Sequence, residues 1–469
     1  MTVEKMAAVI LAAGEGKRMK SQLPKVLHPI CGRPMLEHVI EAAKSICSEI
    51  IVVVGHKGEE VKNFFADTVF YAEQKEQLGT AHAVMQAKSL LPAKGSVLIL
   101  CGDTPLLTAE TLQGLLQTFK ETEAAATILS ARVPDPYGYG RIIRDASGNV
   151  QKIVEEKDAD SKERAVTEIN TGTYLFEVNY LRRALSEVNN DNAQREYYLT
   201  DCIALILQYG GIVNTHLLSD YRLALGVNDR LQLAEAQQLM QERINRQLME
   251  AGVTLIDPKS TYVDAGVQVS QDTILMPQTF LKGETRIGSG CVIGPNTEIT
   301  DCRIGDGVVI RHSVATGCII ADKVTVGPYA HLRPETELKT GVKIGDFVEI
   351  KKSSLGSGSK VAHLAYIGDA QVGQDVNIGA GAIVVNYDGQ NKHQTIIGDE
   401  AFIGCNSNLV APVKIGKGAF VAAGSTIARD VPEGALAIER TQQVNKDGLA
   451  RRFLEKKAAK NDESRQEKE

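Results

Sequence analysis

The chain has 469 residues, of which 43% are hydrophobic and 23% charged, and its net charge is −6. This balance is typical of a globular protein with more than one domain, and the negative charge argues against a general nucleic-acid binder. No stretch approaches the roughly 20 apolar residues that cross a bilayer. The eight cysteines form no CxxC pair. We therefore expect reduced thiols in a soluble, cytoplasmic protein that binds neither nucleic acid nor membrane.

The first apolar run, residues 6–11 (MAAVIL), predicts a buried strand. A glycine-containing loop with Lys17 and Arg18 follows, and Lys25 comes shortly after it. Small residues let backbone amides approach a phosphate, and the three cations can offset its charge. Met19 stands where a Rossmann fingerprint needs its third glycine, and the Walker A pattern is absent. The loop alone fits a phosphate site and a simple strand-to-helix turn equally well.

Two further apolar runs, residues 50–54 (IIVVV) and 97–100 (VLIL), alternate with helix-like segments. This alternation predicts a Rossmann-like α/β domain whose ligand site lies at the carboxyl ends of the strands. Asp103 follows the second run closely. A carboxylate there suits Mg²⁺ held beside phosphate oxygens, although an Asx turn before Pro105 explains the same residue.

Residues 229–252 are rich in helix formers, and Gly252 supplies a stop. Apolar side chains recur on one face of this expected helix, at Leu233, Ala236, Met240, Ile244 and Leu248. Such a stripe indicates a connecting helix packed on one domain rather than a cofactor site.

In the second half, aliphatic residues recur at every sixth position. The longest run consists of Ile397, Ile403, Leu409, Ile415, Val421 and Ile427. Six fits neither the helical period nor strand alternation, and is typical of a left-handed parallel β-helix with one inward aliphatic residue per side. Such a solenoid can be a purely structural spacer or can carry a site.

Between residues 347 and 369 this period is interrupted, which predicts a loop that breaks the repeat and displays functional groups. The segment brings Lys351, Lys352, His363 and Tyr366 into one short stretch. Taken alone, His363 fits an ordinary hydrogen-bonded histidine better than a catalytic one.

Short motifs follow one another along the chain in a recognisable order. Those of the first half are LAAGEGKRM, PK, EQKEQLGTAHA, CGDTPL, YGYGRI, EEKD, INTGTY and GVNDR. Those of the second half are HLRPE, EIKKS, AHLAYIGD, VNIGAG and NYDG. Together they make nearly the whole chain similar to the bifunctional N-acetylglucosamine-1-phosphate uridylyltransferase and glucosamine-1-phosphate N-acetyltransferase family.

The resemblance implies a UTP-dependent site in the first half, with Arg18 and Lys25 as catalytic cations on the phosphates. Asp103 and Asn228 would be the protein ligands of Mg²⁺. Residues that would bind UDP-N-acetylglucosamine are Leu11, Ala12, Ala13, Gly14, Lys25, Gln74, Gly79, Thr80, Gly140, Glu155, Asn170 and Asn228. A phosphate attacks UTP without losing a proton, so alignment and charge neutralisation suffice and no histidine or serine nucleophile is needed.

In the second half, the resemblance makes His363 the base that takes a proton from the glucosamine amine, with Glu349 as the group that orients it. Arg333, Lys351, Tyr366 and Asn377 would bind the amino-sugar phosphate, and Lys352 would be a solvated neighbour. Acetyl-CoA would contact Ala380, Asn386, Tyr387, Cys405, Ala423 and Arg440, and Asn386 would also orient the sugar. Cys405 departs from the serine that is common in the family.

These implications divide the chain into a uridylyltransferase domain (1–228), a linker helix (229–252), a β-helix acetyltransferase domain (253–445) and a charged, disordered tail (446–469). Flat solenoid sides pack as threefold assemblies, so we expect a homotrimer through the β-helix. Two alternatives remain open at this point. One is a nucleotidylyltransferase with an inert solenoid, and the other is a regulatory subunit that binds nucleotide sugars without turnover.

Overall fold

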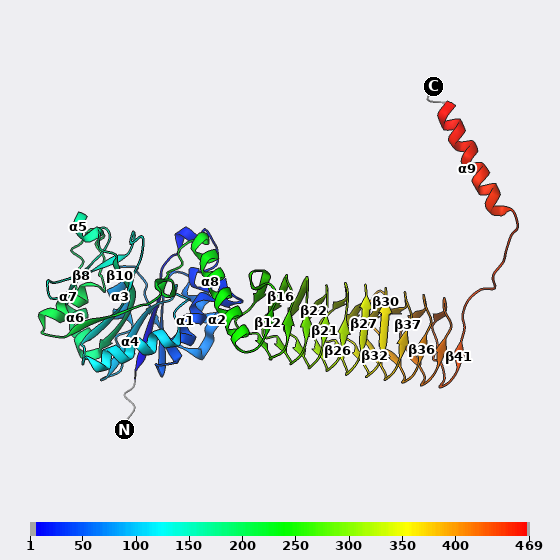
Figure 1. Ribbon diagram of the computed structural model, residues 1–469, viewed down its shortest axis with the longest axis horizontal. Helices are drawn as coiled ribbons and strands as arrows, with labels where there is room; N and C mark the ends of the chain where they lie inside the picture. Colours follow the sequence, from blue (N-terminus) through cyan, green and yellow to red (C-terminus); the bar gives the residue numbers. More distant parts are fainter. Residues whose placement is uncertain (1–5, 467–469) are drawn as a thin grey trace. The chain divides into compact units, whose positions relative to one another are not determined.

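The computed structural model describes residues 6–466 and divides into two compact units, residues 1–286 and 287–469. The first unit holds an α/β sheet, a long helix and the first strands of a β-helix, and the second holds the remaining β-helix strands and a C-terminal helix (Figure 1). No helix among the described residues is long and apolar enough to cross a membrane.

The α/β sheet has the strand order β11-β7-β10-β6-β1-β4-β5, with β8 and β9 attached beside β10. The strands are β1 (Ala7–Ala12), β4 (Glu49–Val54), β5 (Phe70–Glu73), β6 (Ser96–Cys101), β7 (Ala126–Arg132), β8 (Gly140–Arg144), β9 (Val150–Val154), β10 (Glu168–Glu177) and β11 (Val213–Leu217). Within the main order, β10 runs antiparallel to β6 and β7, and the remaining pairs are parallel. The three strands predicted from the apolar runs are confirmed as β1, β4 and β6.

Helices cover both faces of this sheet. They are α1 (Met35–Lys44), α2 (Gly58–Phe65), α3 (Thr80–Gln86), α4 (Ala109–Glu121), α5 (Ser161–Arg164), α6 (Val178–Glu187) and α7 (Asp201–Gln208). Side chains of β1 alternate between two cores: Ile10 packs with residues of α1, α2 and α4, and Val9 packs with residues of α3, α6 and α7. A strand buried on both faces is therefore apolar throughout, as β1 is. The predicted Rossmann-like α/β domain is confirmed.

Helix α8 (Arg230–Glu250) begins after Asp229, whose carboxylate accepts hydrogen bonds from the first backbone amides of the helix. Its buried residues Ala236 and Met240 pack against Ile30 and Met35. The apolar stripe read from the sequence is thus the face by which α8 packs on the α/β part of the first unit.

From β12 (Thr254–Leu255) to β41 (Leu436–Ala437) the chain forms a left-handed parallel β-helix of three sheets. The first sheet contains β27 (Lys343–Asp346), β30 (Lys360–His363), β33 (Asn377–Ile378), β36 (Phe402–Ile403) and β39 (Phe420–Val421). The second contains β28 (Glu349–Lys351), β31 (Tyr366–Gly368), β34 (Ile383–Val385) and β37 (Asn408–Val410). The third contains β29 (Ser354–Leu355), β32 (Ala370–Val372), β35 (Thr395–Ile397) and β38 (Val413–Ile415). Ile397, Ile403 and Leu409 lie on the third, first and second sheet in turn, and each is at most 1% exposed. The six-residue period predicted this architecture correctly.

The predicted interruption at residues 347–369 is not a loop. These residues form β28 (Glu349–Lys351), β29 (Ser354–Leu355), β30 (Lys360–His363) and β31 (Tyr366–Gly368), all within the parallel ladders. The inward residues Ile350, Leu355 and Val361 remain fully buried. Because Leu355 follows Ile350 after five residues instead of six, the period slips by one residue while the coil stays regular.

Beyond the last coil, helix α9 (Leu449–Gln466) occupies most of the segment that the sequence analysis expects to be disordered. Phe453 and Leu454 on this helix are exposed.

We expect Ile320→Ala to destabilise the β-helix by about 2–5 kcal/mol, because it opens a cavity in the coil interior. Ile320 is 1% exposed, whereas its neighbour Ile319 on the same strand, β23 (Ile319–Ile320), is 52% exposed. Ile319→Ala is therefore the matched control and should leave the midpoint of denaturant unfolding nearly unchanged. Equal midpoints for the two variants would contradict the assigned inward face.

Candidate active sites

A pocket of about 280 Å³ opens at the carboxyl ends of β1 and β6. Predicted residues that line it are Leu11, Ala12, Ala13, Gly14, Lys25, Gln74, Gly79, Thr80 and Asp103. The structure therefore brings together, from four separate motifs, the nucleotide side of the predicted site. Parallel strands end at this edge of the sheet, which is where α/β folds bind their ligands.

Gly79 shows why the sequence needs glycine at this pocket. Its φ is +116°, and a Cβ there would lie 2.5 Å from the carbonyl oxygen of Tyr197. The segment around Tyr197 is in turn fixed to α3, since the backbone amide of Leu199 donates to Oγ1 of Thr80 over 3.0 Å. Any larger residue would separate the two segments that form this wall of the pocket.

Lys25 lies at the centre of the polar end of the pocket. Its ammonium contacts the carboxylate of Asp103 and lies 3.1 Å from Oδ1 of Asn228. The amide of Val227 donates to the carbonyl of Asp103 over 2.9 Å, which holds the Asn228 segment beside the strand end. The two oxygens predicted as metal ligands thus converge on one cation position. A carboxylate and an amide carbonyl are donors that suit a hard divalent ion.

The described residues contain no cluster of three or more His, Cys, Asp or Glu side chains that could hold a metal. Asp103 and Asn228 supply two oxygen donors, so a metal bound here would take its other ligands from water or substrate oxygens. The residues present fit an ion that is bound together with phosphates.

A second group of predicted residues, Gly140, Glu155 and Asn170, lies together at the β8–β10 edge. Gly140 pairs with Asn170 in the ladder, and a Cβ on Gly140 would lie 3.5 Å from Oε1 of Glu155. Burial raises the pKa of Glu155, and the hydroxyl of Thr200 donates to its carboxylate over 3.1 Å. These three residues do not line the 280 Å³ pocket.

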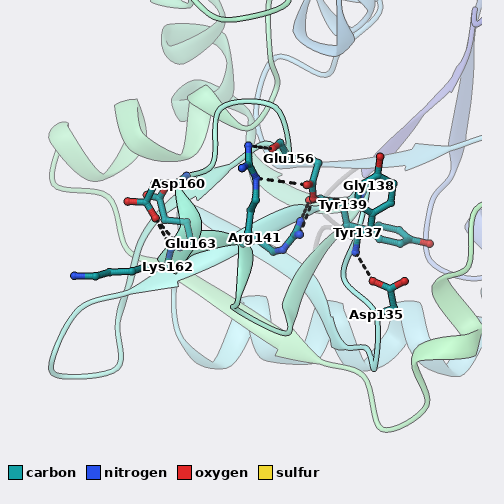
Figure 2. Close-up of polar contacts among 10 residues, drawn as sticks. Asp135, Tyr137, Gly138, Tyr139, Arg141, Glu156, Asp160, Lys162 and Glu163 are labelled. Carbon is teal, nitrogen blue, oxygen red and sulfur yellow. Dashed lines mark hydrogen bonds and ion pairs between the residues drawn. The ribbon is translucent and has the colours of Figure 1, made fainter.

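A buried arginine holds the loops that carry this group in place. Figure 2 shows Arg141 directed at Glu156 and at the carbonyl of Tyr139, to which it also donates. The Arg141–Glu156 ion pair measures 2.6 Å, and the same carboxylate accepts from the amide of Gly138 over 3.1 Å. The Arg141 side chain is 2% exposed and that of Glu156 is 21% exposed, so the guanidinium is shielded from solvent while the carboxylate remains partly accessible.

Five residues that line the first pocket were missed from the sequence: Val26, Gln77, Ala83, Cys101 and Glu196. Gln77 stands within the quoted EQKEQLGTAHA motif and could have been found there, whereas Glu196 carries no local signal. Arg18, in contrast, is exposed on the short helix η1 (Lys17–Met19) and does not line the pocket.

The second candidate site follows one corner of the β-helix. Asp346, His363, Ala380, Cys405 and Ala423 occupy equivalent positions in successive coils. Backbone hydrogen bonds between successive coils fix this column. Leu364 donates to the carbonyl of Asp346 over 3.0 Å, and Gly381 donates to that of His363 over 3.2 Å. Higher up, Asn406 donates to the carbonyl of Ala380 over 2.7 Å, and Gly424 to that of Cys405 over 2.8 Å. The predicted base and three predicted acetyl-CoA contacts therefore lie on one line.

The carboxylate that contacts His363 is Asp346, at Nδ1 of the ring. Glu349, which the sequence analysis expected in that role, instead accepts a hydrogen bond of 2.9 Å from Arg333. That expectation is wrong because Glu349 lies on the second sheet, in register with Tyr366, whereas Asp346 lies on the first sheet in register with His363.

The predicted sugar-phosphate residues Arg333, Lys351 and Tyr366 gather on the second sheet with Asn386. Asn386 donates to Asp369 over 2.5 Å and lies 3.4 Å from the hydroxyl of Tyr366. Gly368 makes room for them, since a Cβ there would lie 2.5 Å from the Tyr366 hydroxyl and 2.7 Å from Nδ2 of Asn386.

Lys392 is a functional candidate that the sequence analysis missed. Its pKa is lowered because its ammonium lies against that of Lys351, with Arg333 adding a weaker repulsion. Asp369 is the nearby carboxylate, 3.8 Å from Nζ of Lys351. Arg333 is also paired with Glu349 over 2.9 Å, so three cations face two carboxylates and leave one positive charge in excess, which suits a phosphate. Lys392 follows the NYDG motif in a segment that leaves the coil after β34 (Ile383–Val385). The six-residue period gives no information about the position of such a segment.

Other predicted contacts are distributed around this corner. Arg440 donates to the carbonyl of Ala423 over 3.1 Å, which places it beside the column. Tyr387 is 56% exposed and donates to the carbonyl of Gly389 over 2.6 Å. Asn377 belongs to the first sheet, on β33 (Asn377–Ile378), whereas Tyr366 belongs to the second. The structure of one chain therefore does not bring Asn377 and Tyr366 onto one face.

Comparison with known proteins agrees with this two-part layout. The family model of the MobA-like NTP transferase domain matches residues 8–173, and that of the bacterial transferase hexapeptide (six repeats) matches residues 394–429. Relatives named "Bifunctional protein GlmU" match almost end to end. That of Geobacillus sp. (strain WCH70) is 56% identical over 97% of this chain and 99% of its own length. The corresponding protein of Caldanaerobacter subterraneus subsp. tengcongensis is 54% identical over 97% and 99%, and that of Listeria welshimeri 51% over 96% and 99%.

We expect brief alkylation with iodoacetamide to label Cys405 before any other cysteine. Cys405 is exposed, whereas burial raises the pKa of Cys31, Cys47, Cys101 and Cys202 to about 12. At about pH 8 only a fraction of ~10⁻⁴ of such a thiol is ionised to the reactive thiolate. Peptide mass spectrometry would check the order of labelling, with Cys405→Ser as the control that removes the fast site. Rapid labelling of Cys202, which is fully buried, would contradict the burial of that thiol.

Proposed function

The chain belongs to the family of bifunctional GlmU proteins, and from that membership we propose that it makes UDP-N-acetylglucosamine in two successive transfers. In the first transfer, acetyl-CoA acetylates the amine of glucosamine-1-phosphate. In the second, UMP passes from UTP to the N-acetylglucosamine-1-phosphate formed, and pyrophosphate leaves. We assign the second transfer to residues 1–228 and the first to the β-helix, residues 253–445, with 229–252 as the linker and 446–469 as the tail.

Uridylyl transfer takes place in the pocket at the ends of β1 and β6. The loop from Leu11 to Gly14 and the wall formed by Gln74, Gly79 and Thr80 hold the nucleotide. Lys25, with Arg18 from the exposed η1 helix, neutralises the phosphates as the sugar phosphate attacks the α-phosphorus. Because the attacking phosphate carries no proton to be removed, catalysis is alignment and charge stabilisation.

Gly140, Glu155 and Asn170 hold the sugar and its N-acetyl group. Gly140 pairs with Asn170 in the ladder and lies next to the Glu155 carboxylate, so the three residues can contact one ligand at this edge. The Arg141–Glu156 ion pair stabilises the loops that carry these residues.

Mg²⁺ would be held by Asp103 and Asn228, whose oxygens already converge on the Lys25 ammonium. When bound, the ion stabilises negative charge that develops on the phosphate oxygens. Lys25 would then be free to contact the phosphates as the ion takes over its two oxygen partners.

Acetyl transfer takes place at the corner of the β-helix. His363 takes a proton from the amine of glucosamine-1-phosphate, because histidine side chains exchange protons near neutral pH. Acetyl-CoA extends along the column above it, over Ala380, Cys405 and Ala423, with Asn386, Tyr387 and Arg440 beside it. Arg333, Lys351 and Tyr366 bind the sugar phosphate.

What supports this assignment most is the column itself. His363 is exposed, and the equivalent positions in the three coils above it carry the small residues Ala380, Cys405 and Ala423. A purely structural solenoid does not require this combination. Small residues above His363 leave room at this corner for an extended ligand that ends at the imidazole.

The protein acts as a homotrimer through the β-helix. Asn377 lies on the first sheet in register with Lys360, before the corner, whereas Tyr366 lies on the second sheet beyond the corner, so the two residues belong to different sides of one chain. A neighbouring copy that presents its first sheet to the second sheet of this chain would complete the site. Exposed apolar side chains at the corner, Tyr329, Phe347 and Leu364, fit such an interface.

Separate variants distinguish the two activities. His363→Ala should reduce acetyl transfer by roughly 10²–10⁴-fold, the usual worth of a general base, and spare uridylyl transfer. Asp103→Ala should do the reverse. Release of free CoA thiol, measured with and without glucosamine-1-phosphate, reports the first reaction, and pyrophosphate release reports the second.

If His363→Ala retained every measurable activity, the β-helix would be a structural support and the protein a nucleotidylyltransferase alone. An unmodified chain with neither activity would favour a regulatory protein that binds nucleotide sugars.

Lys392→Met should raise the KM for glucosamine-1-phosphate in acetyl transfer by on the order of 10-fold, because a charge-assisted hydrogen bond to phosphate is lost. The turnover number should change little. Lys352→Met is the matched control, since Lys352 lies next to Lys351 but its side chain is 56% exposed, with its ammonium near Glu335. An equal change in KM for the two variants would remove Lys392 from the phosphate site.

A further inference from the structure

Asp346 and His363 are the last residues of β27 (Lys343–Asp346) and β30 (Lys360–His363), and they are direct partners in the parallel register. The ladder fixes both backbones, because Leu364 donates to the carbonyl of Asp346 over 3.0 Å and Gly381 donates to that of His363 over 3.2 Å. With both Cα positions set, the Asp346 carboxylate reaches Nδ1 of His363.

This contact determines which ring nitrogen carries the hydrogen. An ionised carboxylate can only accept hydrogen bonds. The hydrogen bond from His363 and one from the backbone lower the pKa of Asp346, so its carboxylate stays ionised near neutral pH. Nδ1 must therefore donate, which leaves the lone pair on Nε2.

We propose that Asp346 is the positioning residue for acetyl transfer: it fixes the ring orientation of His363 and keeps Nε2 as the basic atom. This inference rests on the proposed function of His363. In the step itself, the neutral amine attacks the thioester carbon while Nε2 accepts the proton that the nitrogen loses. The carbon–sulfur bond breaks, and the leaving thiolate takes that proton, giving free CoA and the amide.

The arrangement has little value for stability alone. The His363 and Asp346 side chains are 57% and 35% exposed, and solvent-exposed ion pairs contribute little to folding. Glu349, the carboxylate that the sequence analysis expected in this role, is already paired with Arg333. The sheet register makes Asp346 the carboxylate that pairs with the ring in this chain.

Asp346→Asn and Asp346→Ala test the proposal in the full-length protein. The asparagine keeps the size but can turn its amide NH₂ towards Nδ1 and so favour the opposite tautomer, and the alanine removes the partner. We expect both variants to lower kcat of acetyl transfer by on the order of 10²-fold, while the KM values for acetyl-CoA and glucosamine-1-phosphate and the rate of uridylyl transfer stay unchanged. Glu337→Gln is the matched control, because it neutralises an ion-paired carboxylate on β26 (Glu337–Leu338) of the third sheet.

A spectroscopic measurement is independent of turnover. In protein labelled with ¹⁵N-histidine, the His363 signals can be assigned by their loss in His363→Gln. The unmodified chain should show His363 protonated at Nδ1 above neutral pH, and Asp346→Asn should shift the ring toward the Nε2-protonated form.

An unchanged kcat in both Asp346 variants would overturn the proposal, as would an unchanged tautomer in Asp346→Asn. A raised KM with normal kcat would assign Asp346 to substrate binding, and a lowered melting temperature that accounts for the lost rate would make it structural. If His363→Ala itself retained acetyl transfer, the proposed function would fail. If that variant is inactive and the Asp346 variants are normal, only the present inference fails.

Discussion

The in-register stacking of parallel coils is the constraint on which the second half of this protein depends. Every coil offers its backbone amides and carbonyls to the coils below and above, so a residue's place in the ladder decides which side chains it meets. Asp346 meets His363 for this reason, although the two are distant in sequence. The same rule keeps Glu349 one sheet away, paired with Arg333. The coil and the sheet to which a residue belongs therefore determine which chemical groups its side chain can contact.

The first half follows a different rule, in which strand ends supply the position and loops supply the groups. β1 and β6 run side by side and stop together, so Leu11 and Asp103 arrive at one edge of the sheet. The Asn228 segment is held there by a backbone hydrogen bond to Asp103. In this site the ammonium of Lys25 lies between the carboxylate of Asp103 and Oδ1 of Asn228 and offsets the charge of the carboxylate.

Much of this organisation could be predicted from the sequence, because it rests on periodicity. The six-residue period predicted the β-helix, and the apolar runs predicted β1, β4 and β6. The motifs predicted most residues of the nucleotide pocket. What escaped were contacts between coils and contacts from distant segments: Lys392 against Lys351, Glu196 in the pocket wall, and Asp346 on His363. The sequence predicted a loop at residues 347–369 because one missing residue interrupts the six-residue period. The same missing residue leaves the hydrogen-bonded ladder between the coils intact.

The excursion after β34 has a consequence for how such a protein can change over time. The chain leaves the coil there, presents Asn386, Tyr387 and Lys392, and returns at β35 (Thr395–Ile397), which pairs with β32 (Ala370–Val372) below and with β38 (Val413–Ile415) above. Because the ladder resumes in register, the length and sequence of the excursion are independent of every coil beyond it. New ligand contacts can thus be gained or lost by insertion at a corner, while the repeat that forms the coils is inherited unaltered.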